Sequence, residues 1–431
     1  MSDPLRTKVA QATWRSEADL YPVLRDGLNL SQQTWDNISQ SSHQLISKLR
    51  ADKKPPLIDQ FLTEYGLSSD EGVQLMRLAE ALSRAVDAET ADQLINDKIA
   101  NGNWLSHTGS GNRPMISMSG RMLDRTGKWL RWSARQQRGP ARIISKLGNG
   151  IVRQVTRTAI RALSSQFVFA ETLQGAMKRA KKYQQRGYLF SFDMLGEAAR
   201  TKDDAQKYYD AYRTALDIVA RHAKSSDPCQ NHGISIKLSA LHPRYEYGHA
   251  ADIVPEIVEL LKPLALKSRN ANIQLTIDAE EAERLDISMD VLSSLVAMQE
   301  LTGWHGLGFV VQAYQRRALP LLDWLKIQSD ILGAPLMIRL VKGAYWDSEI
   351  KRAQEMGLES YPVFTRKETT DLSYLSCARK LLDNPTQFSP QFATHNAFTI
   401  AAVQELAGAG RSLEFQRLFG MGQQLHDIIL Q

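Results

Sequence analysis

The chain has 431 residues, of which 43% are hydrophobic and 23% charged, and its formal net charge is +6. These ordinary proportions exclude fibrous and wholly disordered proteins, and the length allows two or three domains with a large buried core. A charge this small does not by itself require a nucleic-acid partner. The two cysteines, Cys229 and Cys377, are far apart and lack CxxC spacing, so a disulfide framework and a cysteine-rich metal site are excluded and a reducing cytoplasm is expected.

The N-terminal part of the chain is predicted to be helical, with an arm over residues 1–100. Its first residues alternate charged with apolar side chains, and no apolar run in the chain reaches about 18 residues. Neither a signal peptide nor a membrane span is therefore expected. Ser68 and Glu71 have the spacing of a capping box and precede apolar residues at helical spacing, which predicts a helix start there.

A basic linker is predicted over residues 101–165. The stretch 113–161 holds twelve Lys or Arg and one acidic residue, which gives it a net charge of +11. We interpret it as short helices that lie over an acidic face of the same protein. Two alternatives stay open: a surface for anionic lipid and, less favoured because aromatic residues are few, a surface for nucleic acid.

The rest of the chain, residues 166–431, alternates short apolar segments with amphipathic helices, which is typical of repeated βα units in a parallel sheet. No G-x-G-x-x-G follows the first strand, which disfavours a dinucleotide-binding Rossmann unit. The predicted strands are 188–195, 233–241, 273–280, 306–314, 336–345, 390–396 and 414–421. Predicted helices between them include 203–223, 253–267, 289–302, 319–332 and 373–382.

Polar residues gather where the predicted strands end. They are Asp193 and Glu197, Lys237, Asp278, Gln312, Arg339 with Lys342, and His395 with Asn396. The carboxyl ends of the strands line the active site of a (β/α) barrel, whereas a doubly wound sheet would concentrate such residues at one switch point. We therefore predict an α/β fold with a TIM-type (β/α)8 barrel. Only seven strands are found, so the last βα unit is expected to be missing.

The charged strand ends allow two interpretations. Lys237, Asp278, Arg339 and Lys342 would converge on one cavity, either as a buried ion-pair network or as a site for an anionic substrate or cofactor. A lyase or aldolase that uses Lys237 as a Schiff-base amine is a further, weaker alternative. His395 has no second His or Cys at ligand spacing, so it is either a structural or a functional hydrogen-bonding residue and no metal is expected.

Two further residues bear on a nucleotide-like cofactor. Gly343 could let backbone N–H groups approach a phosphate, although this signal is weak alone. Trp346 could stack on an aromatic cofactor ring or could lie in the core, and the sequence leaves both readings open.

Eight ordered motifs extend this interpretation: DMLGEAA, GISIKLSALHPRY, IDAEEAERL, GFVVQAYQRR, MIRLVKGAYWDSEIKRAQ, FTRK, QFATHNAFTIAA and EFQRLFGMG. Together they resemble the proline dehydrogenase domain of the proline utilisation A family, and the resemblance extends into the helical N-terminal part. The resemblance implies a distorted (β/α)8 barrel with noncovalent FAD. Its reaction is the oxidation of L-proline to Δ1-pyrroline-5-carboxylate, in the catabolism of proline to glutamate, with electrons passed to a membrane quinone.

The family's functional residues carry over by motif. The catalytic and substrate-side residues would be Lys237, Asp278, Arg339, Tyr345 and Glu197. The residues that hold FAD would be Asp278, Gln312, Arg339, Lys342, Gly343, Ala344, Trp346, Thr365, Arg366, Lys367, Thr394, His395, Asn396, Gln416 and Leu418. Arg339 would lie near flavin N5, where its charge would stabilise the reduced ring.

The resemblance also implies a location and partners. The protein would be cytoplasmic and peripherally associated with the inner face of the cytoplasmic membrane, with contact to anionic lipid and an oligomeric state left open. The ribbon-helix-helix segment of trifunctional members is expected to be missing at this N-terminus, so a DNA-binding regulator of proline utilisation is less favoured.

The C-terminal side departs from the family pattern as well. An eighth strand, the arginine pair that clamps the proline carboxylate and the aldehyde dehydrogenase domain are expected to be missing. Losing a bidentate clamp should raise the Michaelis constant sharply. The alternative to a working enzyme is therefore a catalytically incompetent fragment of the bifunctional protein.

Overall fold

The computed structural model describes residues 3–51, 168–194, 196 and 198–430. They fall into two compact units. The first comprises Met1–Leu49, Thr172–Arg417 and Leu425–Gln431 and contains every strand named below, and the second comprises Arg50–Glu171 and Leu418–Gln424. The predicted capping box at 68–71 and the basic stretch 113–161 lie outside the described residues. The domain boundaries predicted at 100 and 165 lie there too and stay predictions.

Three helices form the described part of the N-terminal arm: α1 (Pro4–Ala12), α2 (Glu17–Leu28) and α3 (Gln32–Ala51). Local sequence explains where the first two begin. The Asp3 side chain accepts a hydrogen bond from the Leu5 amide with proline next in the chain, and Ser16 accepts one from the Asp19 amide. These residues are helical, and the extent of the arm to residue 100 stays a prediction.

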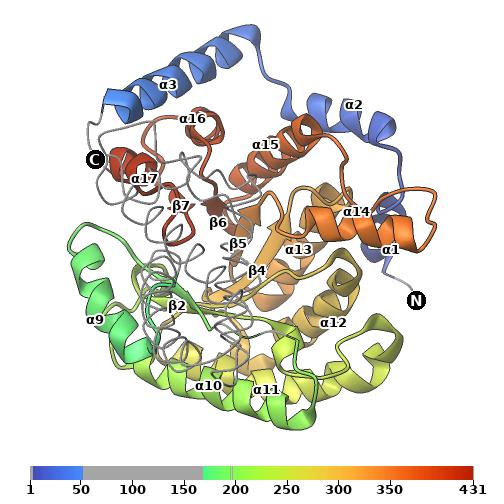
Figure 1. The fold of residues 1–431 in the computed structure, drawn as a ribbon, viewed down its shortest axis with the longest axis vertical. Coiled ribbons are helices and arrows are strands. Elements are labelled where there is room, and N and C mark those ends of the chain that lie inside the picture. The colour runs from blue at the N-terminus through green and yellow to red at the C-terminus, as the bar shows by residue number, and fades with distance from the viewer. Residues whose placement is uncertain (1–2, 52–167, 195, 197, 431) are drawn as a thin grey trace, which may run out of the picture. The chain divides into compact units, whose positions relative to one another are not determined.

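Seven parallel strands make one sheet in the order β1-β2-β3-β4-β5-β6-β7. The sheet forms a curled half-barrel with helices around it, so the predicted TIM-type fold is confirmed (Figure 1). Among the described residues, β1 and β7 are its two outer strands. The strands are β1 (Ser191–Asp193), β2 (Gly233–Ile236), β3 (Leu275–Ile277), β4 (Leu307–Gln312), β5 (Leu336–Val341), β6 (Phe388–Ala393) and β7 (Glu414–Gln416).

Helices alternate with the strands along the chain, as the βα pattern predicts, and α9 precedes β1. They are α9 (Leu173–Gln184), α10 (Lys202–Ala220), α11 (Ala250–Asn270), α12 (Leu285–Val296), α13 (Ala318–Leu332), α14 (Trp346–Glu355), α15 (Lys367–Asp383), α16 (Ala397–Ala407) and α17 (Gln423–Ile429). Short 3₁₀ turns are η1 (Pro228–Gln230), η2 (Leu238–Ala240), η3 (Tyr247–His249), η4 (Ala282–Arg284) and η5 (Gln299–Leu301). Each of the seven strand predictions coincides with an observed strand.

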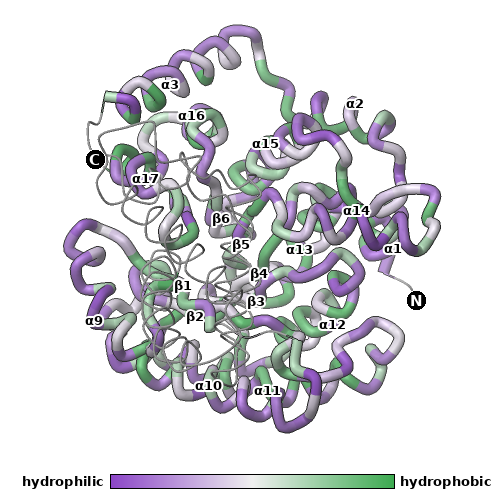
Figure 2. Tube along the Cα trace, in the orientation of Figure 1, coloured by the Kyte–Doolittle hydropathy of each residue, from purple (hydrophilic) through white to green (hydrophobic). Residues whose placement is uncertain are grey.

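The strands β2, β3 and β4 are buried on both faces, which explains their nearly continuous apolar sequences. Every residue of β4 is buried, and so is every residue of β2. Figure 2 shows hydrophilic colours predominating along α3 and α9, which carry few buried residues. The core of the first unit therefore lies between the sheet and the inward faces of helices such as α11 and α12.

The arm helices pack on the outside of the late barrel helices. Leu20 and Leu24 of α2 form a buried cluster with Phe364, which precedes α15. At the start of α1, Asp3 accepts a 3.1 Å hydrogen bond from Trp324 Nε1 of α13. On α3, Asn37 Nδ2 donates to Glu405 of α16 at 2.8 Å. The arm thus contacts three helices that are distant in sequence (Figure 1).

Candidate active site

The centre of the candidate site is Arg339, which β5 directs toward residues of β1, β2 and β3. Its Nη1 donates to Asp278 Oδ1 at 2.8 Å and to Ser235 Oγ at 3.0 Å, and its Nη2 donates to Ser191 Oγ at 2.8 Å. Its Nε is buried and has no hydrogen-bond partner among the described residues. A guanidinium held in this way is a fixed positive charge, and three of its five N–H donors are used by these bonds.

Lys237 and Asp278 complete the cluster from the ends of β2 and β3. Lys237 Nζ lies 2.6 Å from Asp193 Oδ2 and 3.6 Å from Asp278 Oδ2. Burial raises the pKa of Asp278, while the charges of Arg339 and Lys237 act in the opposite direction. Because a hydrogen-bonded Arg339 and the nearby ammonium group of Lys237 face this carboxylate, we expect it to be ionised at neutral pH. Four residues were predicted to converge on one cavity; Lys237, Asp278 and Arg339 contact one another, whereas Lys342 pairs with Asp371.

The carboxyl end of β4 contributes a buried, hydrogen-bonded polar side chain to the site. Gln312 is 4% exposed and donates through Nε2 to the Glu280 carbonyl at 2.8 Å, while its Oε1 accepts from the Ala344 amide at 3.4 Å. Gly343 beside it has a φ of +141°, and an added Cβ would lie 2.4 Å from Tyr314 Cγ. Glycine is therefore required here, because the Tyr314 ring occupies the place of a side chain, and the residue itself is exposed.

Two lysines predicted to hold the cofactor converge on one carboxylate. Lys342 Nζ and Lys367 Nζ lie 2.5 Å and 2.7 Å from the two oxygens of Asp371. Burial raises the pKa of Asp371, but the hydrogen bonds from both lysines outweigh it and hold that pKa below its usual value. The pairing leaves a local excess of one positive charge, which suits an anionic ligand.

The segment around Thr365 presents further predicted cofactor residues. Trp346, at the start of α14, is 42% exposed and donates through Nε1 to the Phe364 carbonyl at 2.8 Å, so it is not a core residue. Arg366 is the N-cap of α15, and it is exposed like Thr365 and Lys367. Tyr345 is half-buried at the N-cap of α14.

The β6 end carries the last group of predicted residues. Burial lowers the pKa of His395 to about 4, assisted by His426 and Arg417, so its ring is neutral at pH 7. Asn396 caps α16 by accepting from the Thr399 amide at 3.0 Å, which is a structural role. The Thr394 amide donates to the Gln416 carbonyl at 3.1 Å and thus joins β6 to β7.

Two predicted residues are not part of this geometry. Glu197 lies outside the described residues. Leu418 belongs to the second unit, where its side chain is 66% exposed. The roles predicted for both stay predictions.

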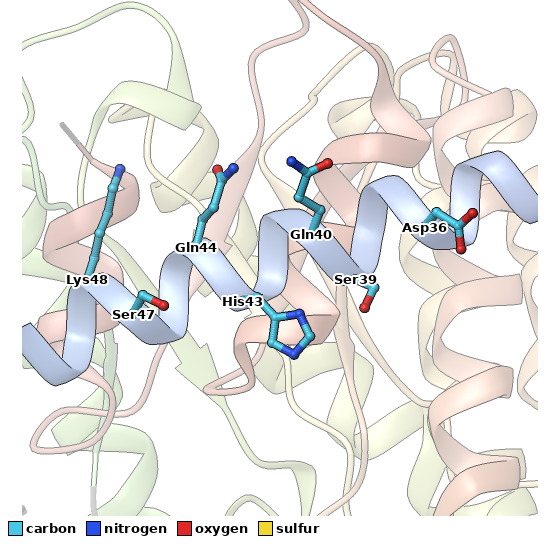
Figure 3. A pocket seen from close by; sticks show the side chains of 7 residues that line it. All are labelled: Asp36, Ser39, Gln40, His43, Gln44, Ser47 and Lys48. Atoms are coloured by element: carbon cyan, nitrogen blue, oxygen red, sulfur yellow. The ribbon is translucent and has the colours of Figure 1, made fainter.

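A separate hollow follows the polar face of α3 and contains none of the predicted site residues. Figure 3 shows its lining side chains, all of which come from that one helix: Asp36, Ser39, Gln40, His43, Gln44, Ser47 and Lys48. In the described part of the chain, no group of three or more His, Cys, Asp or Glu is arranged to hold a metal ion. None of its helices is both long and apolar enough to cross a membrane.

Sequence reasoning missed several residues that shape the site. Ser191 and Ser235 hold Arg339, and both are polar positions inside otherwise apolar strands, which is a signal that could have found them. Asp371 and Glu17 carried no such signal, because their partners are known only from the folded chain.

The family of the chain follows from comparison with known proteins. A family model described as proline dehydrogenase matches residues 176–431, which is more than half of the chain. The chain belongs to the proline dehydrogenase family. A second model, described as the DNA-binding domain of proline dehydrogenase, matches residues 57–167, which lie outside the described residues.

Individual relatives agree with this family. The chain is 44% identical over 436 residues to the bifunctional protein PutA of Klebsiella aerogenes, covering 99% of this chain and 33% of that protein. It is 25% identical over 260 residues to proline dehydrogenase 1 of Bacillus subtilis, covering 59% of this chain and 74% of that protein. A crystal structure of a mutant of Bradyrhizobium japonicum proline utilization A (PutA) matches with a TM-score of 0.72 and 39% identity, over 96% of this chain and 42% of that one. The resemblance predicted from the eight motifs is confirmed.

Proposed function

We propose that this chain oxidises L-proline to Δ1-pyrroline-5-carboxylate with FAD as its cofactor, within the catabolism of proline to glutamate, and passes the electrons to a membrane quinone. The observation that carries this proposal is the cluster of Lys237, Asp278 and Arg339 at neighbouring strand ends of a chain in the proline dehydrogenase family. Such ends form the active site of TIM-type barrels.

The residues present fit a flavin nucleotide. Arg339 offers a buried Nε that has no protein partner among the described residues, and Gly343 offers an exposed backbone. Lys342 supplies positive charge, and the exposed ring of Trp346 supplies a stacking surface. FAD, when bound, accepts the hydride that leaves C5 of proline. The other residues that the family resemblance assigns to FAD, among them Gln312 and Leu418, belong to the same proposal.

The substrate is a zwitterion, and the cluster carries both kinds of complementary charge. Lys237 can bind the carboxylate of proline, while Asp193 and Asp278 can bind its ammonium group. In the reaction the nitrogen gives up a proton and C5 gives up a hydride, so that a C=N bond forms. Arg339, fixed by Asp278 and two serines, provides the positive charge that stabilises the electron-rich reduced state. Tyr345 and Glu197 are proposed to pack against and support the substrate.

The quinone partner implies a location. Because quinones reside in membranes, we place the protein at the inner face of the cytoplasmic membrane as a peripheral protein. Anionic lipid would be contacted through the basic stretch 113–161, whose net charge is +11 over one acidic and twelve basic residues. Association into an oligomer remains compatible with this arrangement.

A second candidate is a chain that has the family fold but does not turn over proline. Among the described residues, β1 pairs with β2 alone and β7 with β6 alone, which leaves two open strand edges. A role as DNA-binding regulator ranks below both, since the match over residues 57–167 is its only new support.

The flavin spectrum separates these candidates. The purified chain is loaded with FAD, freed of unbound flavin and mixed anaerobically with L-proline, with D-proline as the control ligand. We expect retained flavin absorbance that bleaches with L-proline, and no bleaching in an Arg339→Ala variant. Retained flavin that does not bleach with L-proline would favour the candidate that does not turn over proline. Absence of retained flavin would contradict FAD binding itself.

A further inference from the structure

Glu17, in the N-terminal arm, makes an unexpected contact with the predicted cofactor loop. Its Oε2 accepts hydrogen bonds from both the backbone N–H and the hydroxyl of Thr365, at 3.0 Å and 2.9 Å. Burial raises the pKa of Glu17, but hydrogen bonds from Thr369, Thr365 and Arg366 together hold it below its usual value. The carboxylate is therefore ionised at neutral pH and makes charge-assisted bonds.

A second contact fixes the other end of the same loop. Arg316 donates through Nη1 to the Arg15 carbonyl of the arm at 2.9 Å and to Ser360 Oγ at 2.7 Å. Its backbone N–H donates to the Pro362 carbonyl at 3.2 Å. Residues 360–365 are thus tied to the arm at both ends.

The loop in turn holds the residues that would line the cofactor. The Phe364 carbonyl accepts from Trp346 Nε1 at 2.8 Å, and the Phe364 amide donates to the Tyr314 carbonyl at 2.8 Å. The ring of Tyr314 packs directly against the backbone of Gly343. A short series of contacts therefore runs from Glu17 to the proposed flavin contacts at Trp346 and Gly343.

Both hydrogen-bond donors of Thr365 bind Glu17. The positive charge that the loop can present to an anion therefore comes from the next two residues. Arg366 and Lys367 are exposed and directly follow the fixed residue. Anchoring Thr365 limits the conformations available to them, which lowers the ordering cost of binding an anion. Glu17 itself lies outside residues 176–431, the part that the proline dehydrogenase model matches.

We infer that Glu17 is a positioning residue of the arm, which fixes the loop 360–366 for binding of the FAD nucleotide. This inference rests on the proposed function, since that function assigns FAD to the site. Removing the arm contact should weaken FAD binding without altering the groups that touch proline.

The test measures FAD affinity and loop protection in the full chain. Glu17→Ala removes the acceptor, and Glu17→Gln keeps the shape without the charge. We expect FAD to bind roughly five- to tenfold more weakly in Glu17→Ala, because hydrogen bonds to charged acceptors are the strong ones, and Glu17→Gln to restore part of the loss. In the FAD-free chain, hydrogen exchange at the Thr365 amide should be faster in Glu17→Ala than in the unmodified protein.

Two controls exclude a general effect of the arm. Asp26→Ala removes a carboxylate of the same helix that pairs with the adjacent Arg25, and it should leave FAD affinity unchanged. Ser376→Ala removes the 2.7 Å hydrogen bond from Ser376 Oγ to the Leu24 carbonyl, which fastens α2 to α15 away from the loop. It should lower stability and leave FAD affinity within about twofold.

The outcomes are separable. If the unmodified chain binds no FAD, the proposed function and this inference fall together. If it binds FAD and Glu17→Ala binds equally or more tightly, only the inference is overturned, and tighter binding would mean that the carboxylate competes with an anionic part of the ligand. Equal weakening by Ser376→Ala would also overturn it, because arm docking as a whole would then be responsible.

Discussion

Gly343 offers the sharpest test of how the site is built. In Gly343→Ala the new Cβ would lie 2.4–2.5 Å from Cγ, Cδ1 and Cδ2 of Tyr314, about 1 Å short of the roughly 3.5 Å at which carbon atoms pack. Turning the ring about χ2 leaves Cγ in place, and a change of χ1 is opposed by the burial of Tyr314, which is 2% exposed. The Tyr314 backbone is fixed as well, because it donates to the Lys342 carbonyl and accepts from the Phe364 amide.

The expected loss combines two effects. A φ of +141° with a side chain costs about 1–3 kcal/mol, and forced overpacking costs about 1–3 kcal/mol more. We therefore expect Gly343→Ala to lower the free energy of unfolding by about 4 kcal/mol and to weaken FAD binding, since the displaced backbone would contact the nucleotide.

A matched control separates the cost of a positive φ from the cost of steric overlap with Tyr314. Gly357 also has a positive φ, +63°, but a Cβ there meets no atom within 4 Å. Gly357→Ala should cost only about 1–2 kcal/mol. Both variants are compared by urea unfolding and by FAD titration. If the two substitutions lower stability by the same amount, within about 1 kcal/mol, the argument from the Tyr314 ring is wrong.

Two other perturbations test the arm and the β6 end. Leu24→Ala, at a side chain 3% exposed beside Phe364, should cost about 3 kcal/mol in urea unfolding, whereas Val23→Ala, at a side chain 43% exposed, should cost less than about 1 kcal/mol; equal losses would contradict docking of α2. His395 has a folded-state pKa of about 4 against an ordinary value of 6.5, so the folded state resists its protonation and stability should fall as pH decreases from 6.5 toward 4. His395→Gln should make the free energy of unfolding depend less on pH across this range. An unchanged pH dependence would contradict a lowered pKa of His395.

The strands were predictable because their signal is local. The apolar runs that contain β4 and β5 are bounded by polar and turn-forming residues, and a buried parallel strand needs only such a run. The order of the sheet follows from the βα rhythm, because consecutive units of this kind pair side by side. The convergence of Lys237, Asp278 and Arg339 then follows from the order.

Pairings between distant segments could not be predicted in this way. Glu17 and Thr365 are separated by 348 positions, and no periodicity relates them. Asp371 lies on the first turns of α15 with no motif that names it, although it pairs with Lys342. Trp346 could be core or exposed from its sequence context alone, because only the folded loop decides that its ring stays at the surface. The sequence reveals which residues are polar at a strand end, whereas their partners depend on tertiary packing.

The docking of the arm has a consequence for biosynthesis. The arm leaves the ribosome before its partners, which lie 321, 352 and 368 positions later in the chain, at Trp324, Ser376 and Glu405. At about 5–20 residues per second, the apolar face of α2 waits tens of seconds before these partners emerge. During that interval Leu20 and Leu24 have nothing native to cover them, so a nascent chain paused before residue 376 should be a preferred client of chaperones that recognise exposed apolar helices.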